Sequence, residues 1–416
     1  RGASATSAEP NRVLAFWRRR ARTSTAQLAS KAPALCAAPD HHLVDGDQCK
    51  KCLAVSTAAG QIAALAIGIC IVCGLAWAAF KMESWRKKPC IGPLLRLADR
   101  AVTFSYGIGL IPKSKVLLGF YQICIVLSTT YSVRLPERYT SWTDKVSEAV
   151  SIDWSGTFLP PQCLPYWSRL VAVSISPVGV IALLLLAGVG LRLHQRRLAP
   201  APRPLPWHAE AALGLLDLTP ASLFLVFCFV PSVSAFIFRA WSCQAYTISP
   251  PGEALALVEY MRQDASVECG TSEHDSITLL AILLLLLWPF GSLALYTSLL
   301  AACYRPLQAK TANALTEATA FLHREYKRRW YWWEAVELAR KLVLTGAVLL
   351  IPEERAFLRL VVATLICSCY AVGIAAVRPY KRIEDSVLAV AMSLVLLLFF
   401  LGANWTTIYL GIEERH

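Results

Sequence analysis

The sequence has few charged residues for its length. Only 17% of its 416 residues are charged, 56% are hydrophobic, and the mean hydropathy is +0.48. A soluble globular chain has about 25% charged and about 45–50% apolar residues. This scarcity of charge excludes an ordinary water-soluble domain and indicates a protein whose solvent is lipid.

The sequence also lacks the motifs of common enzymes. No GxxxxGK[ST], GxSxG, HExxH or protein-kinase signature occurs in it. All seven histidines lie outside the long apolar runs, so no predicted span offers a histidine ligand to a haem. Acidic residues are nearly missing from the same runs apart from Glu337, which argues against a transporter with a buried carboxylate relay. We therefore expect no enzymatic activity, no cofactor and no bound metal.

Apolar runs long enough to cross a bilayer, which takes about 20 residues, recur along the chain. They show no alternation of the barrel-strand type, so they predict an all-α, polytopic helical membrane protein. The sixth run is short and ends at Pro352, so the sixth and seventh could instead form one re-entrant hairpin. The predicted domain covers residues 56–411, with about eight transmembrane helices at 56–80, 115–133, 170–191, 221–238, 276–303, 335–351, 357–377 and 386–410.

Lysine and arginine alternate between the two sets of loops. The loops 81–115, 192–220, 304–334 and 378–385 hold 21 of them, and the other loops with the C-terminal tail hold 8. Basic loops favour the cytosolic side. The pattern therefore predicts an integral protein of the plasma membrane with both termini outside, and it explains the net charge of +13 without nucleic acid as a partner.

The N-terminal part has a different composition. Residues 1–35 are basic and rich in Ala, Ser and Thr, which predicts a disordered tail. Residues 36–55 carry three cysteines and two histidines. They fit either the end of an extracellular disulfide-rich module, with a further cysteine upstream of Arg1, or a metal site that lacks the second paired element of zinc patterns. These five residues are Cys36, His41, His42, Cys49 and Cys52.

Two other cysteines share one predicted outside loop. Cys243 and Cys269 both lie between the fourth and fifth spans. Because an extracellular loop is in an oxidising compartment, we expect a disulfide bond between them.

The stretch 328–346 combines aromatic and charged residues. Its four consecutive aromatics predict an interfacial belt, because such rings prefer the headgroup level. The charged residues that follow recur at i, i+3 and i+7 and are continued by a threonine at i+11, so they form one helical stripe that should face protein or water. We expect Glu337 and Lys341 to pair within it, and the stripe fits either a structural anchor or a gate of a permeation path. The belt is Trp330, Tyr331, Trp332 and Trp333, and the stripe is Glu334, Glu337, Lys341 and Thr345.

Five stretches together resemble a known membrane domain. They are "KSKVLLGFYQI", "FLVFCFVPSVSAFIFRAWSC", "DASVECGTSEH", "FLHREYKRRWYWWEAVELARKLVLTG" and "RPYKRIEDSVLA". They resemble the C-terminal, TRP-like membrane domain of large algal and oomycete surface proteins with cysteine-rich or EGF-like repeats. The resemblance covers residues 49–411 and implies a membrane protein and a cation channel, although the upstream repeats are reduced here to one short cysteine cluster.

Two functions follow as hypotheses. The first is a TRP-like cation channel or channel-like subunit, whose pore draws on the late spans, on the charged stripe and on the acidic outer loop Glu253–Asp275. The second is a non-conducting receptor or anchor whose extracellular part binds ligand or matrix. The candidate partners are the lipid bilayer, cations, further copies of the chain and an extracellular ligand.

Overall fold

The computed structural model describes residues 41–44, 48–51, 60, 68, 100, 103–105, 107–131, 164–198, 205–248, 256–311, 313–352 and 355–413. The chain forms two compact units. One comprises Arg1–Ile62 with Trp154–Pro165, and the larger one comprises Ala63–Asp153 with Tyr166–His416. The described residues are mostly helical, as the sequence predicts, and the chain also has short strands that an all-α prediction does not include.

The smaller unit contains an antiparallel β-hairpin. Strands β1 (His41–Val44) and β2 (Gln48–Lys51) pair with Leu43 opposite Cys49. The hairpin lies within the predicted cysteine-rich segment 36–55. The predicted tail 1–35, Cys36 and Cys52 lie outside the described residues.

Five helical segments of the larger unit are long and apolar enough to cross a membrane. They correspond to the third, fourth, fifth, seventh and eighth predicted spans. The third of these segments is continuous from Ser272 to Ala309 but contains one turn of π-helix, η3, at Pro289. The segments are α8 (Tyr166–Leu198), α9 (Trp207–Phe238), α10–η3–α11 (Ser272–Leu285, Leu286–Phe290 and Gly291–Ala309), α15 (Ala356–Val377) and α16 (Ile383–Glu413).

Two further helices fall where the second and sixth spans are predicted. Helix α5 (Leu110–Tyr131) has Lys113 and Lys115 in its first turns, and α14 (Trp333–Thr345) has only 13 helical residues. At 1.5 Å per residue α14 is about 20 Å long, which is shorter than the roughly 30 Å hydrocarbon core. The predicted first span, 56–80, lies almost wholly outside the described residues.

Helices α8 and α9 cross at two glycines. A Cβ atom on Gly188 would lie 2.4 Å from the carbonyl oxygen of Gly214, and one on Gly214 would lie 2.8 Å from the carbonyl oxygen of Gly188. Small residues at a crossing let two membrane helices approach closely. This crossing fixes α9 against α8, and α9 in turn packs against α14.

Helix α9 continues through two prolines, so it is longer than the predicted span 221–238. Pro231 has no N–H group and therefore leaves the carbonyl of Phe227 without its helical donor. Gln122 of α5 supplies that donor, since its amide nitrogen lies 3.3 Å from the Phe227 oxygen. Hydrogen bonds from neighbouring helices are how membrane helices tolerate proline, and this one links α5 to α9.

A three-stranded antiparallel sheet connects α9 to α10. It is formed by β3 (Cys243–Ile248), β4 (Ala256–Met261) and β5 (Asp264–Glu268). The disulfide bond predicted between Cys243 and Cys269 is present and joins the start of β3 to the residue after β5. The disulfide therefore closes the base of the sheet.

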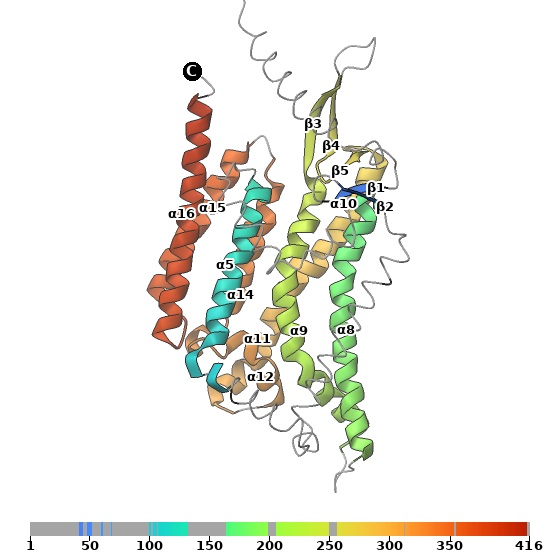
Figure 1. Ribbon diagram of the computed structural model, residues 1–416. Helices are drawn as coiled ribbons and strands as arrows, with labels where there is room; N and C mark the ends of the chain where they lie inside the picture. The colour runs from blue at the N-terminus through green and yellow to red at the C-terminus, as the bar shows by residue number, and fades with distance from the viewer. Residues whose placement is uncertain are drawn as a thin grey trace, which may run out of the picture. The chain divides into compact units, whose positions relative to one another are not determined.

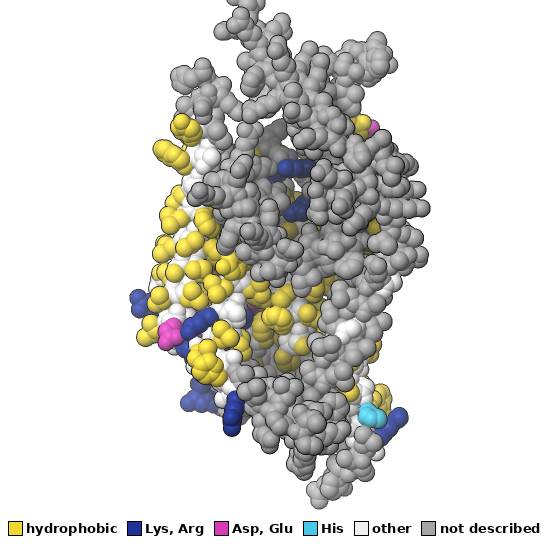
Figure 2. Space-filling model, viewed as in Figure 1, with side chains coloured by type: hydrophobic (Ala, Val, Ile, Leu, Met, Phe, Trp, Pro, Cys, Tyr) yellow, Lys and Arg dark blue, Asp and Glu magenta, His cyan; other side chains and the backbone are white. Residues whose placement is uncertain are grey.

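Helices α5, α14, α15 and α16 share one apolar core. Phe120, Leu344, Leu360 and Phe400 are among the residues of this core. Lys113 and Glu384, near the starts of α5 and α16, form an ion pair at 3.0 Å, so these two helices run in the same direction. Figure 1 shows that successive helices of the larger unit alternate in direction, and Figure 2 shows the apolar flank of α16 with Lys and Arg side chains gathered at its starting end.

Candidate functional site

The predicted stripe lies on α14, which the surrounding helices hold on several sides. The Tyr131 hydroxyl of α5 donates a hydrogen bond of 2.7 Å to the carbonyl of Leu344, near the end of α14. Gly346 ends the helix beneath the ring of Phe238, where a Cβ atom would come within 2.4 Å of a ring carbon. Helix α14 is therefore packed into the protein and turns its charged side chains toward its neighbours.

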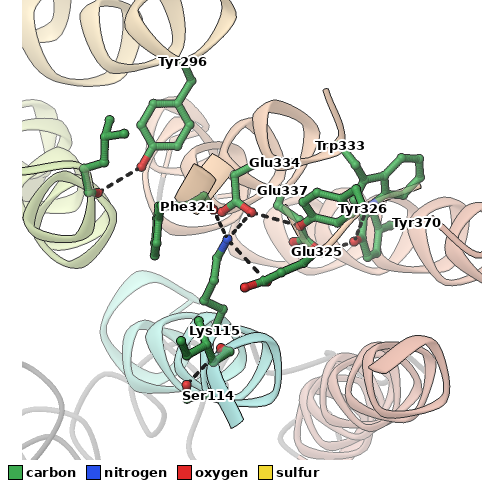
Figure 3. Close-up of polar contacts among 12 residues, drawn as sticks. Ser114, Lys115, Tyr296, Phe321, Glu325, Tyr326, Trp333, Glu334, Glu337 and Tyr370 are labelled. Atoms are coloured by element: carbon green, nitrogen blue, oxygen red, sulfur yellow. Dashed lines mark hydrogen bonds and ion pairs between the residues drawn. The ribbon is translucent and has the colours of Figure 1, made fainter. Parts of the chain in front are cut away.

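Glu334 is paired with a lysine of α5. The Nζ atom of Lys115 lies 2.7 Å from Glu334 Oε2, and the Tyr326 hydroxyl donates to the same oxygen at 2.9 Å (Figure 3). Lys115 Nζ also donates to the Phe321 carbonyl at 2.8 Å and lies 3.8 Å from Glu325 Oε2. Glu334 is only 3% exposed, so this pair is buried inside the larger unit.

Glu337 has a different set of partners. Arg340 Nη2 lies 2.9 Å from its Oε2 atom, and the hydroxyl of Tyr370 on α15 donates to its Oε1 atom. The Arg340 guanidinium also lies 4.2 Å from the centre of the Tyr370 ring. The Trp333 indole N–H donates to the Tyr370 hydroxyl at 3.4 Å. Glu337, Arg340 and Tyr370 therefore join α14 to α15.

Lys341 does not make the predicted pair with Glu337. Among the described side chains, the ion pair of Glu337 is with Arg340, and Lys341 extends toward α9 with its Nζ atom 3.8 Å from the centre of the Phe227 ring. Gly119 of α5 provides the room, since a Cβ atom there would lie 2.7 Å from Lys341 Cε. A cation over an aromatic face is stabilised by the ring quadrupole. The cation–π contact and the free space beside Gly119 draw the lysine away from the carboxylate.

Thr345, the last residue of the stripe, is fully buried. Its hydroxyl donates to the carbonyl of Lys341 at 2.8 Å, within α14 itself. The stripe is thus brought together on one buried side of the helix, but Thr345 is engaged with its own backbone.

Six charged residues form what we call the charge cluster: Lys115, Glu325, Glu334, Glu337, Arg340 and Lys341. They line one small cavity, of about 30 Å³, together with apolar side chains and Tyr326. Water needs at least about 10–15 Å³ of such space, so the cavity has room for one or two molecules. Three acids face three bases, and the cluster carries no net charge when all six are ionised.

Of the three acids in the charge cluster, Glu325 lies outside the helices, in the segment between α13 and α14. Burial raises the pKa of its carboxyl above the ordinary value, and the Lys115 ammonium partly offsets this. Glu325 Oε2 and Arg340 Nε are both buried and have no hydrogen-bond partner among the described residues. A polar cavity beside such atoms is a place where water can bind.

The four aromatics at the start of α14 lie in two environments. Trp332 is 39% exposed, and Trp330 and Tyr331 are partly exposed, whereas Trp333 is buried at 6% and packs on Tyr370. The ring centres of Trp330, Trp332 and Trp333 lie 5.6–6.1 Å apart. The aromatic run therefore has an exposed part beside a buried anchor of α14.

The segment before α14 is also tied to the α15–α16 connection. Tyr326 and Tyr380 form an isolated antiparallel β-bridge, with their ring centres 5.0 Å apart. The Lys327 N–H donates to the Pro379 carbonyl at 2.8 Å, and the Lys381 N–H donates to the Glu325 carbonyl at 2.9 Å. These bonds hold Glu325 and Tyr326 beside the charge cluster.

The stripe predicted from the sequence left out five residues of this site: Lys115, Glu325, Tyr326, Arg340 and Tyr370. Lys115 lies at the edge of an apolar run. Because an unpaired charge is costly in a membrane helix, this position indicates that an acidic side chain should pair with it. The two tyrosines gave no such signal, since their roles depend on which helices pack together.

Comparison with known proteins gives no relative for this chain: no family model, curated protein or solved structure matches it.

Proposed function

We propose that the chain is a polytopic membrane protein with eight spans, in which α5, α14 and residues 56–80 add to the five long apolar helices. The alternating helix directions and the basic residues at one end support this arrangement. In the proposed topology the basic end faces the cytosol, and both termini lie outside the plasma membrane.

A tag placed after residue 416 tests the orientation. It should react with an antibody on intact cells, whereas a tag inserted after residue 203, in the predicted cytosolic loop 192–220, should react only after permeabilisation. The opposite pattern would contradict the proposed topology.

Within this topology, the function we propose is that of a TRP-like cation channel or channel-like subunit. The observation that carries the proposal is the charge cluster. Charged side chains inside a membrane bundle are costly, and by default they indicate a functional site. Here they gather on α14 at its contacts with α5 and α15.

The cluster is suited to a gate because its contacts can exchange. Glu337 lies near two cations, Arg340 and Lys341, but forms an ion pair with only one of them. The cavity of about 30 Å³ is too small for an ion path, so the described conformation corresponds to a closed state. Opening would separate α14 from α5 at the pair of Lys115 with Glu334 and would expose the carboxylates to passing cations.

Single-channel recording tests the proposal. The full chain, reconstituted in a planar bilayer with asymmetric KCl, should show cation-selective events that change in the Glu337→Gln variant. Glu384→Gln is the matched control, because Glu384 is an exposed residue of α16 that pairs with Lys113 of α5 and lies outside the charge cluster. The double variant Glu337→Gln/Arg340→Gln removes both partners, so no unpaired charge is left to unfold the helix.

The balanced pairing of the cluster favours a second function, a non-conducting receptor or anchor. Three acids facing three bases around a small cavity also describe a clamp that only holds α5, α14 and α15 together. A silent bilayer, with the protein shown to be folded and inserted, would support this alternative over the channel.

A further inference from the structure

A second cavity opens at the end of the larger unit where the basic loops meet. Its volume is about 590 Å³, and it lies between the end of α11, the short helices α12 (Ala314–Ala318) and α13 (Ala320–His323), the segment that leads to α14, and the α15–α16 connection. Sites for small molecules are typically about 300–1,000 Å³. We call this cavity the basic pocket.

The rim of the basic pocket is strongly cationic. Four exposed cations line it, Lys310, Arg324, Arg328 and Lys381, against the single acid Glu317. The net charge of the lining is therefore +3, in contrast to the neutral charge cluster. Such a concentration of one sign in a concave site raises the local concentration of anions.

The floor of the pocket is buried and already hydrogen-bonded. His323 Nε2 lies 3.2 Å from the Thr316 carbonyl, which can only accept, so this ring nitrogen carries the proton. Burial lowers the pKa of His323, and the cations Lys381 and Lys115 lower it further, which keeps the ring neutral. The floor therefore adds no charge, and the recognition of a ligand falls to the rim.

The fold holds the rim cations close together. Lys381 Nζ donates to the Arg324 carbonyl at 2.6 Å, and its backbone N–H donates to the Glu325 carbonyl at 2.9 Å. Burial lowers the pKa of Lys381, and the guanidiniums of Arg324 and Arg328 lower it further. Because these like charges repel one another, an anion bound between them would lower the electrostatic free energy of the folded chain.

The neighbouring residues indicate where the pocket lies. Tyr331 lines it, and the partly exposed Trp330 and the exposed Trp332 flank that tyrosine in the chain. Aromatic rings of this kind gather at the level of the lipid headgroups. Arginine binds phosphate through paired N–H groups, and basic clusters at the cytosolic face attract anionic lipids.

We propose that the basic pocket binds a multiply phosphorylated anionic group, presented either by a lipid headgroup or by a soluble phosphate ester. This goes beyond the proposed channel function and does not depend on it, because a receptor or anchor could carry the same site.

Binding to the purified full chain in detergent tests the proposal. The probes are a short-chain phosphatidylinositol bisphosphate and soluble inositol trisphosphate, with short-chain phosphatidylcholine as the zwitterionic control. The pocket variant is Lys310→Gln/Arg328→Gln. Its matched control, Arg305→Gln/Arg329→Gln, removes two exposed cations from the same segments but outside the lining.

The pocket variant should weaken binding of the phosphorylated probe about thirtyfold, because it removes two of the cations that attract the anion. The matched control should change the affinity for the phosphorylated probe less than about threefold, because its two cations lie outside the lining. Binding of the lipid alone would assign the source to the membrane, and equal binding of inositol trisphosphate would assign it to a soluble phosphate ester.

A variant of opposite sign keeps the test independent of folding defects. Glu317→Gln removes the one acid among the described residues that line the pocket and should tighten binding of the phosphorylated probe. The proposal would be overturned if neither phosphorylated probe bound, or if the pocket and control variants lost affinity equally.

Discussion

The pair of Lys115 with Glu334 gives the sharpest test of the packing of α14. Replacing Lys115 by Met removes the ammonium but keeps the length of the side chain, and leaves Glu334 as a buried carboxylate with Tyr326 as its remaining hydrogen-bond donor. Replacing Glu334 by Gln in the same chain removes the unpaired charge. The single variant should therefore be less stable than the double variant.

The magnitude follows from the distance and the burial of the pair. At 2.7 Å and an effective dielectric constant of about 20, the Coulomb attraction is about 6 kcal/mol before the cost of removing both charges from water. Breaking a buried pair from one side typically costs about 3–5 kcal/mol, whereas removing both partners is often close to neutral. We expect about 3–5 kcal/mol of destabilisation for Lys115→Met and less than about half of that for Lys115→Met/Glu334→Gln.

The measurement is the free energy of unfolding in mixed micelles for the wild type, both single variants and the double variant. The exposed pair of Lys113 with Glu384, at 3.0 Å, is the control, and its removal should change the free energy of unfolding far less, because water screens an exposed pair. The reasoning would be refuted if the effects of the two single variants simply added in the double variant, because charges that are not coupled give additive changes.

Three further predictions concern other parts of the larger unit. Gly214→Ala on α9 should cost about 1–3 kcal/mol, because its Cβ would overlap the backbone of α8, whereas Gly190→Ala on α8, two residues after Gly188, has open space and should be tolerated; equal thermal stability of the two variants would contradict the tight crossing. The pKa of His323 is lowered by burial, so the unfolded chain binds its proton more readily and stability should fall as the pH drops below about 6.5. The melting temperature of a His323→Gln variant should fall less steeply as the pH drops. An unchanged pH dependence of the melting temperature would contradict the role of His323. Asn404-Trp405-Thr406 matches the N-glycosylation sequon, but Asn404 donates to Thr364 at 2.8 Å and lies within α16, so it should carry no sugar and glycosidase treatment should leave the electrophoretic mobility unchanged; a shift that Asn404→Gln abolishes would show the opposite.

Much of the fold could be predicted because apolar length alone identifies a membrane helix. Helices α8, α15 and α16 each contain a long uncharged stretch, and they cover the predicted spans 170–191, 357–377 and 386–410. The π-helical turn at Pro289 does not interrupt its segment, since the Trp288 indole N–H donates to the Ser174 carbonyl of α8. Local composition was sufficient for the five long apolar segments, whereas the spans predicted at 56–80, 115–133 and 335–351 stay predictions.

Prediction failed where the outcome depends on partners far away in the chain. The order Glu337 then Lys341 favours an i,i+4 pair on an isolated helix. In the folded chain Tyr370, from α15, and the gap left by Gly119, from α5, redirect these two side chains to different neighbours. Such contacts are worth more than the few tenths of a kcal/mol of an exposed helical pair, and no local pattern reveals them.

The charge cluster and the basic pocket share one turn of the chain. Arg324 lines the pocket, Glu325 lines the small cavity, and Tyr326 lines both while its hydroxyl holds Glu334. A phosphorylated anion in the pocket would therefore place negative charge one residue from Glu325, whose carboxyl is already disfavoured as an anion by burial. The bound anion would favour protonation of Glu325 and so weaken the contact of Glu325 with Lys115. The ion pair of Lys115 with Glu334 would be retained. By linkage, the factor by which the bound anion shifts the equilibrium of the charge cluster is also the factor by which that shift changes the affinity for the anion, so this turn would couple the two proposed sites.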